Sequence, residues 1–94
     1  MNTYSTTWTP TGDLTMETAL ATLAAGQQKI VNAPNSLTID LQKIAVIDSA
    51  GIAVLLEWRR FTKAQQKSLT LQNPPPKLLA IATLCNLQNI LAFS

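Results

Sequence analysis

Few side chains in this sequence could perform chemistry. The 94 residues include no histidine and one cysteine, Cys85. A catalytic triad with an imidazole base is therefore excluded, as are an internal disulfide and a zinc site built from cysteine and histidine. The five acidic residues are scattered, and their spacing indicates no acid–base pair. The sequence predicts a protein that is not an enzyme and that binds neither a metal nor a cofactor.

The most informative polar run is Asp-Ser-Ala-Gly at residues 48–51. It follows an apolar extended segment and precedes a long helical pattern, so it marks a helix N-terminus. Capping of the exposed amides by Asp48 or Ser49 would alone account for both residues. A second interpretation is that Ser49 is phosphorylated there, because a helix N-terminus favours anions and a phosphate adds about −1.5 to −2 charges. A nucleophilic serine is not indicated, since no histidine could activate it.

The elements that must position this run alternate between strands and helices. Strand-forming or alternating residues predict strands at 4–8, 36–41, 44–47 and 68–72, with a short strand or helix approach at 13–15. Helical periodicity and capping predict helices at about 15–31, 50–66 and 77–84, and residues 90–93 are expected to form a short helix or extended segment. The apolar stripe expected on the first helix is Leu20, Leu23, Ala24, Ile30 and Val31. This alternation indicates an α/β domain with a partly parallel sheet.

The predicted helix at 50–66 has two apolar stripes, whereas an ordinary surface helix has one. The stripe expected to pack on the sheet is Ile52, Leu55 and Leu56. The opposite stripe is Ala50, Val54, Trp58 and Phe61. If the second stripe faces solvent at least in part, its two aromatic side chains could anchor a partner protein. The alternative is that Trp58 or Phe61 packs under a neighbouring helix or the C-terminal segment.

Composition restricts the classes of partner. Hydrophobic residues make up 47% of the chain, charged residues 13%, and the formal net charge is +2. Arg59, Arg60, Lys63 and Lys67 are interpreted as charges that complement a helix C-terminus, so no nucleic-acid surface is predicted. No secretory signal is evident, and the longest apolar runs fall short of the ~20 residues that span a bilayer. We therefore expect a cytoplasmic protein that does not insert into membranes.

Three stretches, in their positions relative to the expected strands and helix, resemble the signature of STAS domains: residues 37–41, residues 47–52 and the pair Leu55-Leu56. Residues 12–15 and 84–87 extend the resemblance over nearly the whole chain. It implies a single STAS domain over residues 1–94, with a small mixed, partly parallel β-sheet of about four strands and three to four helices packed against it. It also implies a non-catalytic function, since STAS domains bind protein partners.

Residues 55–58 and 73–84 look more like the MlaB-type branch, the small STAS subunit of the Mla phospholipid ABC transporter. This implies an accessory subunit that binds and supports the ATPase subunit in phospholipid traffic and outer-membrane lipid asymmetry, and that is peripheral to the inner membrane through its partner. The alternative is an anti-sigma factor antagonist, in which the anti-sigma factor kinase would phosphorylate Ser49. The expected partner-binding residues are Asp48, Ser49, Ala50, Val54, Trp58 and Phe61.

Overall fold

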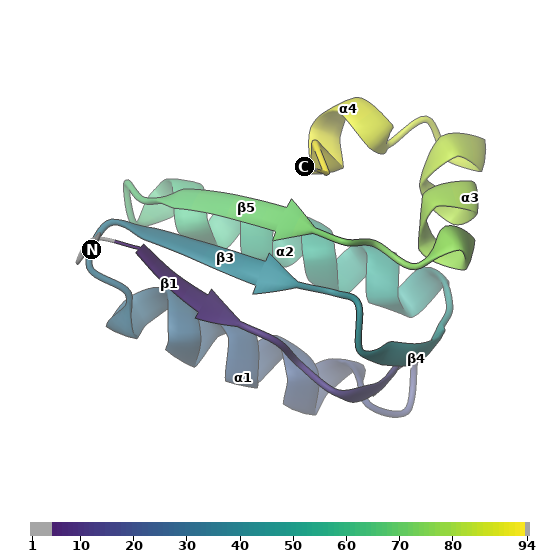
Figure 1. Cartoon of the computed structure of the whole chain (residues 1–94), viewed down its shortest axis with the longest axis horizontal. Helices are drawn as coiled ribbons and strands as arrows, with labels where there is room; N and C mark the ends of the chain where they lie inside the picture. Colours follow the sequence, from purple (N-terminus) through teal and green to yellow (C-terminus); the bar gives the residue numbers. More distant parts are fainter. Residues whose placement is uncertain (1–4, 94) are drawn as a thin grey trace.

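The structure, a computed structural model, describes residues 5–93 as alternating strands and helices (Figure 1). The strands are β1 (Ser5–Trp8), β2 (Gly12–Leu14), β3 (Ser36–Asp40), β4 (Ile44–Ile47) and β5 (Ser68–Gln72). The helices are α1 (Ala19–Asn32), α2 (Ser49–Ala64), α3 (Pro76–Leu84) and α4 (Gln88–Leu91). The expected α/β fold and its order of elements are confirmed, and Tyr4 of the expected first strand lies outside the described residues.

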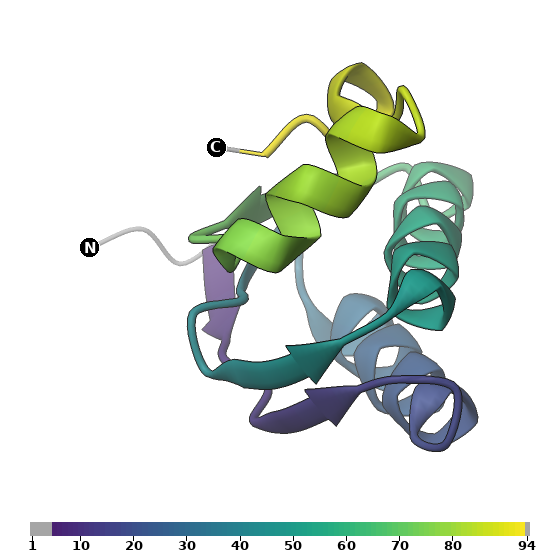
Figure 2. The same ribbon diagram turned by 90° about the vertical axis from the view of Figure 1, so that its right-hand side faces the viewer.

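The strands form two parallel sheets. One has the order β1-β3-β5, and β2 pairs with β4 in the other (Figure 2). In the larger sheet Thr7, Thr38 and Thr70 lie side by side on neighbouring strands. The apolar residues that precede and follow the threonines of β3 and β5 point to the opposite face of the sheet. That face is covered by α1 and α2, which lie behind the sheet in Figure 1. The strand residues that the helices bury are Leu37, Ile39, Leu69 and Leu71.

Helix α2 has two apolar stripes because it has two sets of neighbours within the chain. Ile52 and Leu55 are buried on the side that was expected to pack on the sheet. The opposite stripe packs along α1, with Val54 and Trp58 buried in the core and Phe61 partly buried against it. Helices α3 and α4 also contact α2. Both stripes therefore stabilise the fold itself.

Helix α1 begins later than the sequence indicates, at Ala19 rather than near Thr15. The Thr18 hydroxyl donates to the carbonyl of Asp13 at 2.8 Å and accepts from the amide of Thr15 at 3.0 Å. These local bonds satisfy backbone groups in a turn and so compete with the first helical turn. At the other end of the helix, Lys67 donates to the carbonyls of Ile30 and Val31, both at 2.9 Å.

Arg59 joins the C-terminal helices to the sheet. Its guanidinium donates to the carbonyl of Leu91 at the end of α4 (Nε, 3.1 Å) and to the carbonyl of Leu69 in β5 (Nη1, 2.8 Å). Partial burial lowers the pKa of the Arg59 side chain. The interaction also protects part of β5, an edge strand whose free backbone groups could otherwise pair with another chain.

Candidate functional site

The junction between β4 and α2 is organised by the carboxylate of Asp48. This residue is the N-cap of α2, and its Oδ1 atom accepts from the amide of Ala50 at 2.8 Å. The Oδ2 atom accepts from the amide of Met16 at 3.1 Å, and the amide of Asp48 donates to the carbonyl of Leu14 at 3.3 Å. One carboxylate therefore caps α2 and fixes the loop between β2 and α1 beside it.

Gly51 permits this close approach. A Cβ atom at this position would lie 2.7 Å from the carbonyl oxygen of Leu14 and 2.8 Å from Cγ1 of Ile47. Real Cβ atoms do not come so near to backbone oxygen, and the backbone of Leu14 is held by its bond to Asp48. The small residue in the first turn of α2 thus keeps residues 14–16 against residues 48–51.

Ser49 is exposed as the first residue of α2. Its hydroxyl makes no hydrogen bond within residues 5–93, so it is available to solvent, a partner or a modifying enzyme. The amides of the first helical turn give this position a partial positive charge, which favours an anion there. The arrangement suits contact or phosphorylation.

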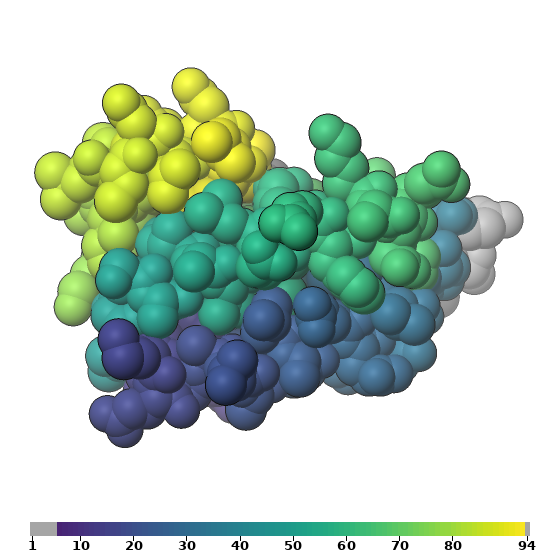
Figure 3. All heavy atoms as spheres, turned by 180° about the vertical axis from the view of Figure 1, so that it is seen from behind, coloured from purple at the N-terminus to yellow at the C-terminus, as the bar shows by residue number. Residues whose placement is uncertain are grey.

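An apolar surface adjoins Ser49. A groove of about 190 Å³ runs between the start of α1 and the start of α2, and all the residues that line it except Glu57 are apolar. Leu20, on its α1 side, is 83% exposed, and Met16 in the preceding loop is 79% exposed. Ala53 lines the α2 side and is also exposed. We call Met16, Leu20, Ser49, Ala50 and Ala53 the docking surface; Figure 3 shows the starts of α1 and α2 side by side on this face of the molecule.

The carboxylate of Asp40 is held by hydrogen bonds within the domain. Asp40, at the end of β3, accepts from the amide and side chain of Gln42 and from the side chain of Asn73. The hydrogen bond from the Gln42 amide is the main cause that lowers the pKa of Asp40. Among residues 5–93, no three His, Cys, Asp or Glu side chains gather to hold a metal ion. No helix in that part of the chain is long and apolar enough to cross a bilayer.

Comparison with known proteins places this geometry in a family. The family model described as "Mlab, STAS domain" matches residues 9–92. The chain belongs to the STAS domain family. A search of curated proteins gives no match. STAS domains are protein-interaction modules and are generally non-catalytic regulators or accessory domains.

Three solved structures share the STAS fold. The anti-sigma factor antagonist SpoIIAA in its unphosphorylated form is similar with a TM-score of 0.71 and 20% identity, over 95% of this chain and 79% of that chain. A putative anti-sigma factor antagonist from Thermotoga maritima gives 0.76 and 20%, over 89% and 73%. A sulfate transporter family protein from Wolinella succinogenes gives 0.73 and 17%, over 93% and 70%. At these identities the likeness shows the fold alone.

The expectation that the second stripe of α2 faces solvent is wrong for Val54 and Trp58, which are buried. The indole N–H of Trp58 donates to the carbonyl of Leu23 at 3.1 Å, and its ring meets that of Trp8 edge-on with centroids 5.6 Å apart. Phe61 is half-buried. Helix α1 covers most of this stripe: Trp58 is fully enclosed, and Val54 reaches the surface only at the bottom of the groove between the starts of α1 and α2. Asp48, Ser49 and Ala50 do lie together at the start of α2.

The sequence reasoning missed Met16, Leu20 and Ala53, and it assigned Leu20 to the core. The inner face of α1 is instead Ala19, Leu23, Gly26 and Ile30. A Cβ atom on Gly26 would lie 2.2 Å from the Trp58 ring, so the indole packs directly on the backbone of α1 at this position. Gly26 is the residue in the sequence that indicates which face of α1 packs closely against a neighbouring side chain. Its spacing to Leu23 and Ile30 leaves Leu20, Ala24 and Val31 toward solvent.

Proposed function

We propose that this chain is a non-catalytic accessory subunit that binds and supports the ATPase subunit of an ABC transporter for phospholipid traffic and outer-membrane lipid asymmetry. The observation that carries the proposal is the match of residues 9–92 to the MlaB-type family model. In this proposal the protein is cytoplasmic, is held at the inner membrane by its partner and binds no nucleic acid.

The docking surface is the proposed contact with the ATPase subunit. Leu20 and Met16 expose apolar area that water solvates poorly, and burying such a side chain contributes about 1.5–3 kcal/mol. Ser49 directly precedes Ala50, which lines the same groove as Leu20, and Asp48 caps this helix start. Large apolar side chains around a pre-organised polar centre are typical of protein interfaces. Val54 and Trp58 support this surface from inside the domain.

Co-expression with the transporter ATPase of the same host tests the proposal. We expect the two proteins to purify as a stable complex through a high-salt wash, because the proposed contact is mainly apolar. We also expect the ATPase to lose most of its hydrolysis activity when this chain is omitted. An ATPase that purifies alone with full activity, and that gains nothing from the added chain, would refute the proposal.

A second candidate function is an anti-sigma factor antagonist that is switched by phosphorylation of Ser49. The observation that favours it is the exposed Ser49 hydroxyl at a helix N-terminus beside an apolar groove. A phosphate there would be stabilised by the helix dipole and would disrupt an apolar contact by its charge.

Intact-mass analysis after incubation with host extract and ATP separates the two functions. The switch predicts the mass of one phosphate on the wild type and none on Ser49→Ala. An unmodified chain that forms a stable ATPase complex excludes the switch and supports the accessory subunit.

A further inference from the structure

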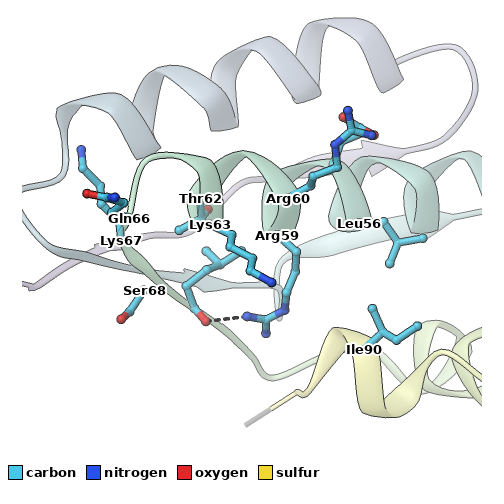
Figure 4. Close-up of a pocket in the computed structure, with 11 residues that line it drawn as sticks. Leu56, Arg59, Arg60, Thr62, Lys63, Gln66, Lys67, Ser68 and Ile90 are labelled. Atoms are coloured by element: carbon cyan, nitrogen blue, oxygen red, sulfur yellow. Dashed lines mark hydrogen bonds and ion pairs between the residues drawn. The ribbon is translucent and has the colours of Figure 1, made fainter.

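A second and larger groove lies at the other end of α2. It has a volume of about 880 Å³ and runs between the C-terminal half of α2, the beginning of β5 and the short helix α4 (Figure 4). It shares only Glu57 with the lining of the apolar groove beside Ser49. An interaction in this groove would therefore be additional to the proposed docking surface and does not depend on the proposed function.

The groove concentrates positive charge. Four of the chain's seven Lys and Arg residues line it, against one acidic residue, Glu57. Two of the four, Arg59 and Lys67, donate to backbone carbonyls, which are neutral and do not offset the positive charge of these side chains. The ion pair of Arg60 with Glu57 is 3.6 Å long between exposed side chains, which makes it weak. Lys63 has no ion pair within the described residues. The groove thus carries an excess of cations.

The same groove has an apolar floor. Leu56 is half-buried and Leu69 is buried. Ile90 of α4 is 57% exposed, and Figure 4 shows it facing Leu56 across the groove. Complementing the dipole at the end of α2 would explain Lys63 alone, since Arg59 and Arg60 precede the last turn of the helix. It does not explain a hollow that combines cations with aliphatic side chains.

We propose that this groove binds an acidic polypeptide segment of a partner protein. A bulky apolar side chain of the segment would lie on Leu56 and Ile90, and its Asp or Glu carboxylates would face Arg60 and Lys63. The donors of Arg59 are already engaged by carbonyls, so the cations do not converge into a cage for one phosphate group. A peptide that carries both acidic and bulky apolar side chains is complementary to the cations at the side of the groove and to the aliphatic residues at its floor.

Selection from a display library of random short peptides tests this proposal with the intact chain. The test variant is Arg60→Glu with Lys63→Glu, and the matched control is Lys29→Glu with Lys77→Glu. All four lysines and arginines are exposed, and both double variants change the net charge equally, so differences between them report the groove. Thermal melting checks that each variant is folded.

We expect the wild type to enrich peptides that carry net negative charge and a bulky apolar residue. The affinity of these peptides for the test variant should be at least about tenfold lower than for the wild type, because the attraction between their carboxylates and the cations at positions 60 and 63 is lost. Their affinity for the control variant should stay within about twofold of the wild-type value. Enrichment of neutral or basic peptides, no enrichment, or equal loss in both double variants would overturn the proposal. Binding to anionic phospholipid vesicles that requires Lys63, without peptide binding, would also overturn it and assign the groove to a membrane surface.

Discussion

Replacing Trp58 by alanine is expected to lower the free energy of unfolding by about 3–5 kcal/mol, the usual cost of truncating a buried aromatic side chain. The indole is fully buried between α1 and the sheet, where it contacts the ring of Trp8 and donates to the carbonyl of Leu23. The ring packs directly on Gly26, which has no side chain of its own to fill the space that the indole would leave. Because small domains have a free energy of unfolding of about 5–15 kcal/mol, this variant should be partly unfolded at moderate temperature. Chemical denaturation measures the change.

Trp58→Phe is the matched control. It retains an aromatic ring in the cavity but loses the hydrogen bond to Leu23, a bond that contributes about 1 kcal/mol. It should therefore be more stable than Trp58→Ala, and its partner binding should be nearly unchanged at a temperature where it is folded. If Trp58→Ala unfolds like the wild type yet fails to bind its partner, the indole belongs to the docking surface and the structural assignment is wrong.

Much of the fold could be predicted because local patterns agree with the final structure. The repeated alternation in Ser-Leu-Thr-Ile-Asp and Ser-Leu-Thr-Leu-Gln predicts strands that became β3 and β5, paired in register. The Asp-Ser-Ala-Gly run predicts a helix start, and Asp48 is its N-cap. These signals depend on neighbours in the sequence, so the sequence alone suffices for them.

The burial of the second stripe of α2 by helix α1 could not be predicted in the same way. A stripe that contains Val54 and Trp58 is equally suitable for a neighbouring helix or for a partner, and periodicity does not distinguish the two. The difference lies in α1, where the Trp58 ring packs on the backbone at Gly26 and Leu20 faces solvent. The candidate surface therefore lies at the starts of α1 and α2 and not at Trp58.

Leu20→Glu is expected to weaken binding to the ATPase subunit by more than about 2 kcal/mol, or about 30-fold, as for a central interface residue. Leu20 is 83% exposed and lines the groove opposite Ala50 and Ala53. Burial of a carboxylate in its place in an apolar contact would carry a desolvation cost. The stability of the domain itself should change by less than about 0.5 kcal/mol, as for most surface substitutions. Leu84→Glu is the matched control, because Leu84 is 86% exposed on α3, away from the docking surface.

The most direct test of whether the partner binds at the docking surface is calorimetry on folded protein. It measures the dissociation constant of the ATPase complex with the wild type, with Leu20→Glu and with Leu84→Glu. Partner binding through the paired starts of α1 and α2 predicts a large loss for Leu20→Glu and a near-native constant for Leu84→Glu. Native affinity in Leu20→Glu, or a loss found only in Leu84→Glu, would show that the partner binds elsewhere on the domain.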